Sequence, residues 1–146
     1  MATDRKAQKR SRASAKAAGA SFEIRMAEHL REALDNPYIS RMDKNGGKDL
    51  GDLAYVGYLG MGVNGVPITW EAKNTASMNL TSATREAHTE AANYQEKYGG
   101  PLPIALVNHK RHGVAAPGKQ WVTMTVDQFV RLLRIAEGVD SRPFDE

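Results

Sequence analysis

The sequence predicts an α/β fold in which a mixed central β-sheet is flanked by helices, and three observations lead to it. Segments of strand length alternate with segments of helical periodicity in the order helix, three strands, helix, strand, strand, helix. Residues 102–110 begin almost entirely apolar, as a strand covered on both faces does. Residues 83–98 place small side chains at helical spacing, which allows close packing on a sheet. With 146 residues, of which 41% are hydrophobic, the chain suits one core.

The first half of the chain supplies one helix and three strands. Ser21 can cap a helix whose apolar stripe includes Phe22, Met26 and Leu30, and Asn36-Pro37 ends it. Strands are predicted at residues 38–42, 52–56 and 66–73. The glycine-rich connection before the third strand contains Asn64-Gly65, which suits a tight hairpin turn.

The second half supplies two helices and two strands. The helix at 83–98 ends at Gly-Gly-Pro, and strands follow at 102–110 and 120–124. The last helix opens with a capping box formed by Thr125 and Gln128. Its apolar face is expected to comprise Val126, Phe129, Val130 and Leu133. We expect a flexible basic arm at residues 1–18, a folded domain at 19–137 and an acidic tail at 138–146.

Composition excludes several classes of protein. No apolar run reaches the ~20 residues that span a bilayer, and the N-terminus lacks the apolar region of a secretory signal. The absence of cysteine excludes disulfides and thiolate metal sites, and it fits a cytoplasmic protein that needs no membrane.

Charge is distributed unevenly along the chain. The formal net charge is only +3, but the first 20 residues carry six basic side chains and one acidic side chain. A basic arm on a nearly neutral domain favours a polyanionic partner, most simply DNA, although a solvated leader has the same composition. The basic residues of this arm are Arg5, Lys6, Lys9, Arg10, Arg12 and Lys16.

Two charged residues interrupt the apolar third strand. Glu71 and Lys73 are two positions apart, so a strand directs both side chains to one face. Asp52 begins the neighbouring strand after a glycine, and Glu23 lies on the helix expected to cover the same face. Convergent carboxylates suit Mg²⁺, which can activate a water, and a lysine can position or deprotonate that water. Alone, the Glu-x-Lys spacing favours a surface ion pair.

The pattern Gly51-Asp52, then Glu71-Ala72-Lys73, resembles the PD-(D/E)XK nuclease superfamily in motif and element order. The chain is also similar over residues 10–136 to Holliday-junction resolvase-like endonucleases of actinobacteriophages. The resemblance implies Mg²⁺-dependent cleavage of branched DNA during DNA recombination, by a homodimer in the host cytoplasm, with Mn²⁺ as a substitute metal. Many members of the superfamily have proline where this chain has Gly51.

The resemblance also implies roles for individual residues. Asp52, Glu71 and the backbone carbonyl of Ala72 would ligate the metal, and Lys73 would orient the attacking water. Glu23 would join the metal directly or through water. Asp43 and Asp49 are alternatives to Asp52, whereas Glu86, Glu90 and Gln95 are expected to be solvated helix residues.

Further DNA contacts are expected in the basic loop that follows the fourth strand, at Lys110, Arg111 and His112. Trp70 and Trp121 are expected in the core or at an interface. Two alternatives to a resolvase remain at this point. One is a restriction- or repair-type nuclease of the same fold acting on duplex or single-stranded DNA, and the other is a non-catalytic DNA-binding module.

Overall fold

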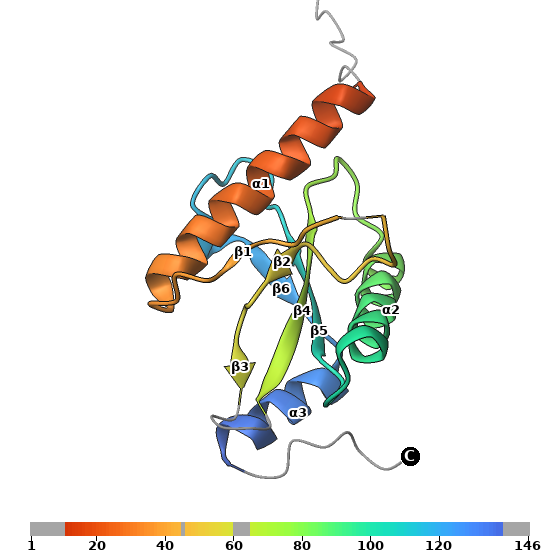
Figure 1. Cartoon of the computed structure of the whole chain (residues 1–146). Coiled ribbons are helices and arrows are strands. Elements are labelled where there is room, and N and C mark those ends of the chain that lie inside the picture. Colours follow the sequence, from red (N-terminus) through yellow and green to blue (C-terminus); the bar gives the residue numbers. More distant parts are fainter. Residues whose placement is uncertain (1–10, 45, 60–64, 139–146) are drawn as a thin grey trace, which may run out of the picture.

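The structure, a computed structural model, describes residues 11–44, 46–59 and 65–138. A mixed β-sheet forms its centre, with strands in the order β1-β2-β4-β5-β6 and helices on both faces (Figure 1). The strands are β1 (Ser40–Arg41), β2 (Leu53–Ala54), β3 (Tyr58–Leu59), β4 (Val66–Lys73), β5 (Ile104–His109) and β6 (Trp121–Thr123). The helices are α1 (Arg12–Ala33), α2 (Leu80–Tyr98) and α3 (Val126–Ala136), with a 3-10 turn η1 (Pro117–Lys119).

Strand β4 is the axis of the sheet. It pairs in parallel with β5, from Ile68 opposite Ile104 to Lys73 opposite His109, and α2 makes the crossover between them. Its other edge pairs antiparallel with β2, where Leu53 lies opposite Trp70, and with β3 nearer its start. The carboxyl ends of β4 and β5 therefore lie side by side at one end of the sheet.

The two faces of the sheet are covered by different helices. Phe22 and Met26 of α1 pack on the face that carries Trp70 and Leu106. Ile135 of α3 packs farther along the same strands, against Val66 and Ile104. The opposite face is covered by α2, through a cluster of buried small side chains: Ala83, Ala87, Ala91, Ala105 and Val107. The predicted mixed sheet between helices is confirmed.

Helix α1 begins earlier than the sequence predicts. Ser11 is the N-cap and accepts a hydrogen bond from the backbone N–H of Ser14, so the prediction that Ser21 caps this helix is wrong. Residues 12–18, expected in the flexible arm, are helical, and they are solvent-exposed up to Ala17. Alanine-rich sequence has high helix propensity, and this sufficed to extend the helix beyond its packed part. Residues 1–10 of the arm lie outside the described residues.

The other boundaries are close to those predicted. Strand β4 has the predicted bounds, and α2 begins three residues early because Asn79 caps it. The glycine-rich connection contains the additional strand β3, whereas Asn64 of the expected hairpin turn is outside the described residues. Gly99 ends α2 with φ of 71°, a left-handed conformation that glycine adopts without strain.

Helix α3 packs differently from expectation. Thr125 caps it as predicted, but Gln128 accepts a hydrogen bond from the backbone of Ala105 instead of completing the capping box. The predicted apolar face is largely exposed, and Ile135 with Leu132 contacts the sheet instead. The exposed side chains of that face are Val126 (77% exposed), Phe129 (49%), Val130 (36%) and Leu133 (43%).

Candidate active site

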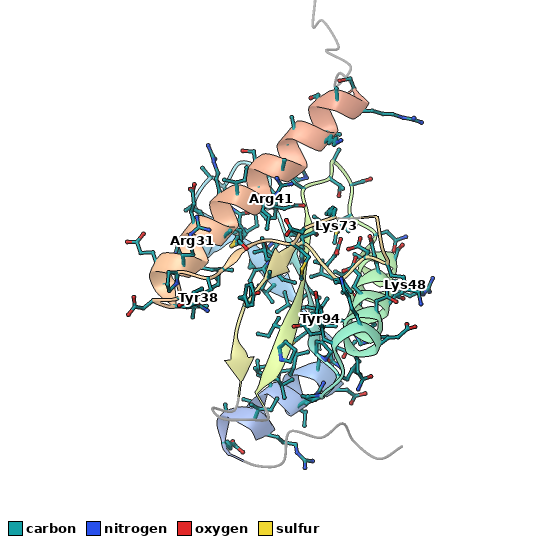
Figure 2. The ribbon with its side chains drawn as sticks, in the orientation of Figure 1. Arg31, Tyr38, Arg41, Lys48, Lys73 and Tyr94 are labelled. Carbon is teal, nitrogen blue, oxygen red and sulfur yellow. The ribbon has the colours of Figure 1, made fainter. Side chains whose placement is uncertain are left out.

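Glu71 and Lys73 lie on the same face of β4, as their spacing predicts. The Lys73 ammonium is 3.1 Å from Oε1 of Glu71 and 2.7 Å from Oε2 of Glu86 on α2. Lys73 therefore joins the sheet to the helix that covers it, at the carboxyl end of β4 (Figure 2). Glu71 is 3% exposed, so this is not a surface ion pair.

Asp52 is held against the edge of β4 by an unusually close backbone approach. Its backbone N–H donates to the Trp70 carbonyl at 2.8 Å, and its Oδ2 accepts from the Ala72 N–H at 2.7 Å. Gly51 makes this approach possible. Its φ of +106° is closed to proline, and a Cβ there would lie 3.3 Å from the Trp70 carbonyl oxygen. The glycine in place of proline thus has a local structural reason.

Glu23 reaches this region from the opposite side of the sheet. The expectation that α1 covers the face bearing Glu71 is wrong, because the apolar stripe of α1 packs on the Trp70 face. The Glu23 carboxylate instead accepts a 2.8 Å hydrogen bond from Arg41. Burial raises its pKa, and the nearby charge of Asp52 raises it further. Glu23 is therefore a neighbour of Asp52 rather than of Glu71.

Glu90 on α2 is the buried residue that sequence reasoning missed. It was expected to be solvated, but it is 2% exposed and lies near Glu71, so that expectation is wrong. A signal was present: Glu90 falls seven residues after Ala83 and three after Ala87, within the stripe of alanines that meets the sheet. With both carboxyls ionised, neither oxygen of Glu90 nor Oε2 of Glu71 has a hydrogen-bond donor among the described residues.

Both carboxyls have a raised pKa, but each acts on the other in a different direction. Burial raises the pKa of Glu71 to about 7, even though hydrogen bonds from Glu90 and Lys73 oppose the shift. The pKa of Glu90 is raised to about 11, first by burial and then by the hydrogen bond to Glu71 and the negative charge of Glu71. A proton on Glu90 can be donated to the Glu71 carboxylate, so above about pH 7 the pair holds one proton between β4 and α2.

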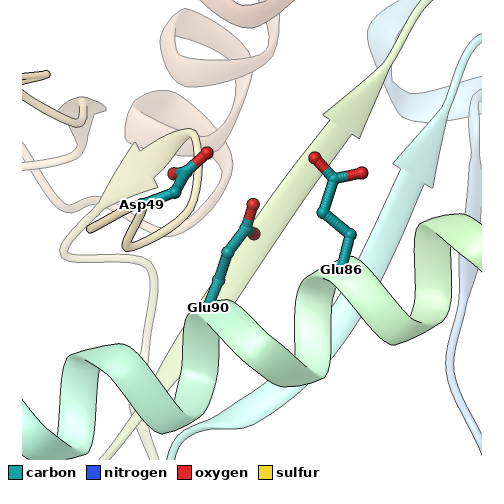
Figure 3. Close-up of side chains that lie close together, drawn as sticks. All are labelled: Asp49, Glu86 and Glu90. Atoms are coloured by element: carbon teal, nitrogen blue, oxygen red, sulfur yellow. The ribbon is translucent and has the colours of Figure 1, made fainter.

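A third acidic position faces Glu90 from the loop before Asp52. One carboxylate oxygen each of Asp49, Glu86 and Glu90 lie within 4.8 Å of one another, and Figure 3 shows the three side chains converging. Asp43, the other alternative to Asp52, is exposed.

The whole region has an excess of negative charge. Six carboxyl groups lie in this region: Glu23, Asp49, Asp52, Glu71, Glu86 and Glu90. Arg41, Lys44 and Lys73 form ion pairs with four of them, Glu23, Asp52, Glu71 and Glu86. Buried carboxylates without enough counter-charge take up protons or bind cations. The oxygen-only donor set fits a hard divalent cation such as Mg²⁺ beside Asp52 and Glu71, where Oε2 of Glu71 has no donor among the described residues when Glu90 is ionised.

The expected DNA contacts are only partly grouped around this centre. A hollow of about 500 Å³ is lined by Lys73 together with Lys110, Arg111, His112 and Trp121. The ammonium of Lys110 donates to the carbonyls of Arg111 and Val114, so it stabilises its own loop.

The two tryptophans differ in their surroundings. Trp70 lies in the core and donates its indole N–H to Asn108 at 3.2 Å. Trp121 is half exposed, and the guanidinium of Arg111 stacks 4.2 Å from its ring centroid. Of the expected arm residues, Arg12 and Lys16 are exposed on α1, and Arg5, Lys6, Lys9 and Arg10 lie outside the described residues.

Among the described residues, no helix has the length and apolarity needed to cross a membrane. No family model matches this sequence, and no curated protein or solved structure matches it significantly.

Proposed function

We propose that this protein is a metal-dependent DNA endonuclease with its active centre at the carboxyl end of β4. One observation supports this most strongly. Asp52 and Glu71 come together beside Lys73 in a buried, carboxylate-rich region, where Oε2 of Glu71 has no donor among the described residues when Glu90 is ionised. The resemblance to PD-(D/E)XK nucleases supports the same interpretation, because these three residues match its motif.

In this proposal Asp52, Glu71 and the Ala72 carbonyl would hold Mg²⁺, and Glu23 would support the site through Asp52. The metal would supply a water of lowered pKa and would neutralise charge on the phosphate. Hydrolysis forms a bond from the water oxygen to phosphorus and breaks one from phosphorus to a sugar oxygen, which takes up a proton. One water is consumed, and a phosphate monoester and a hydroxyl are formed.

Lys73 acts in this scheme as a fixed cation and hydrogen-bond donor. Burial alone would lower its pKa, but hydrogen bonds to Glu86 and Glu71 outweigh burial and raise it. A lysine that stays protonated cannot deprotonate water. It can orient the water and stabilise the negative charge that develops on the phosphate.

The proposed substrate is branched DNA, as in the Holliday-junction resolvases that the chain resembles. The basic arm would bind the phosphate backbone, and Arg111 and His112 would contact the strand next to Lys73. Paired cuts on a junction need two active centres, so the proposal includes a homodimer. In the proposed homodimer, the exposed apolar face of α3 forms the interface between the two subunits.

The test is a cleavage assay with four-way junction, duplex and single-stranded DNA, in Mg²⁺ and in EDTA. We expect symmetric nicks in the junction that need metal and disappear in Asp52→Asn. Asp43→Asn is the matched control, because Asp43 is exposed in the same loop, and it should cleave as the wild type does. Cleavage mainly of duplex ends or single strands would show that these, and not junctions, are the substrate. Tight binding without cleavage in any metal would make the protein a DNA-binding module.

A further inference from the structure

A second group of oxygen ligands lies next to the proposed centre, outside the motif that identified it. Asp49 comes from the loop between β1 and β2, and Glu86 and Glu90 come from successive turns of α2 (Figure 3). Acidic clusters are common on protein surfaces, so the cluster alone assigns nothing. Glu90 is different, because it is only 2% exposed and, when it and Glu71 are both ionised, neither of its oxygens has a hydrogen-bond donor among the described residues.

We propose that Asp49, Glu86 and Glu90 form a binding site for a hard divalent cation, separate from the position between Asp52 and Glu71. Three carboxylates from two elements supply the oxygen ligands that Mg²⁺, Mn²⁺ and Ca²⁺ prefer. Two of the three residues are exposed, so water can complete the coordination and a cation can enter from solvent.

The loop that contributes Asp49 is fixed on α2 by its own contacts. The backbone carbonyl of Asp49 accepts a 2.9 Å hydrogen bond from Asn93, and Lys48 forms a 2.9 Å ion pair with Glu96. Oδ1 of Asp49 also accepts from the Gly51 N–H at 3.1 Å, which orients its carboxylate. These contacts hold the loop ligand and the helix ligands in one arrangement before any cation binds.

Lys73 lies at the border of this site. Its ammonium contacts Oε2 of Glu86 at 2.7 Å, so a cation held by Glu86 is repelled by a fixed positive charge. The site should therefore bind a cation more tightly when that charge is removed. This expectation separates a ligand role of Glu86 from a purely structural role as the partner of Lys73.

Titration with Mn²⁺, followed by electron paramagnetic resonance of the free ion, tests the proposal without DNA. We expect Asp49→Asn and Glu86→Gln each to weaken one binding event at least tenfold, whereas Lys73→Met strengthens it. Glu28→Gln is the control, since Glu28 is an exposed carboxylate on α1, which packs on the opposite face of the sheet. Circular dichroism and the Tm in EDTA establish that the variants fold. Glu90→Gln gives a third ligand variant, which keeps the shape of the buried side chain.

Asp52→Asn separates this inference from the proposed nuclease. If binding persists in Asp52→Asn and weakens in Asp49→Asn, the site stands even when no DNA is cleaved. Unchanged Mn²⁺ affinity in both Asp49→Asn and Glu86→Gln overturns it, as does the absence of Mn²⁺ binding by the wild type. Weakening in both Glu86→Gln and Lys73→Met also overturns it, because that result indicates a structural ion pair.

Discussion

The carboxyl groups of Glu71 and Glu90 face each other in the buried layer between β4 and α2. Burial raises the pKa of both groups, and a hydrogen bond between them keeps the proton on Glu90. The pair lies next to Lys73, whose ammonium contacts Glu71 at 3.1 Å. This arrangement is costly for the metal-free protein at neutral pH and favours cation binding.

The stability of the metal-free protein should depend on pH through this pair. A carboxyl whose pKa is raised on folding binds its proton more tightly in the folded state. Its contribution to the free energy of unfolding is therefore greatest below the unfolded pKa of 4.5 and is lost as pH rises through the folded pKa. For Glu71 the loss falls between pH 4.5 and about 7, and for Glu90 it continues above pH 7. The charged groups facing the pair are Lys73 on β4, Glu86 on α2, and Asp49 and Asp52.

Glu90→Gln should flatten this decline, because glutamine cannot ionise and can still donate to Glu71. Urea unfolding in EDTA at several pH values measures the effect. Glu96→Gln, whose carboxylate is exposed, should leave the pH profile unchanged. If the free energy of unfolding of the wild type and of Glu90→Gln depends on pH in the same way, Glu90 ionises in the folded protein without loss of stability.

Lys73→Met should lower the cleavage rate by about 10²–10³, the usual cost of removing one electrostatic stabiliser. It also leaves Glu71 without its cation, so the Tm in EDTA should fall more at pH 8 than at pH 6, where Glu71 binds a proton. Lys48→Met is the control, since its ion pair with Glu96 is exposed. Wild-type cleavage by a folded Lys73→Met protein would remove Lys73 from the mechanism.

Gly51→Ala should destabilise the protein by about 1–3 kcal/mol, because the backbone conformation is strained for alanine and its Cβ would press on β4. It should also reduce cleavage by displacing Asp52. Chemical denaturation measures the first effect. Gly47→Ala is the matched control, since a Cβ at Gly47 meets no atom within 4 Å. Equal stability of the two variants would contradict the close approach at Gly51.

Deletion of residues 1–10 should weaken DNA binding and flatten its salt dependence. The segment contains Arg5, Lys6, Lys9 and Arg10, and the slope of log K against log salt falls by ~0.9 for every phosphate that is no longer neutralised. The deletion keeps Ser11, so the cap of α1 remains. Fluorescence anisotropy at several salt concentrations gives the slope. An unchanged slope means that this segment does not touch DNA.

Phe129→Glu combined with Leu133→Glu should convert a dimer into a monomer in sedimentation velocity. Both side chains are exposed on α3, so the substitutions should cost little stability in the monomer. Ile24→Glu, an equally exposed apolar position on α1, should leave the dimer intact. A wild-type protein that sediments as a monomer at every concentration would exclude this interface.

The sequence alone determined the elements whose pattern is local. A mostly apolar run predicted β4 at its observed bounds, and the two-residue spacing placed Glu71 and Lys73 on one face. Helical spacing of alanines identified the face of α2 that meets the sheet. These features depend only on the spacing of residues along one helix or strand, because the backbone geometry of that element fixes the direction of each side chain.

Only the tertiary structure decided which surfaces meet. Periodicity marks an apolar face, but it does not say what covers that face, so the exposed stripe of α3 and the position of α1 opposite Glu71 could not be predicted. The same limit hid Glu90, because burial of a carboxyl depends on a neighbouring strand that supplies Glu71 and Lys73. The motif was thus local, whereas its electrostatic surroundings were created by packing between distant segments.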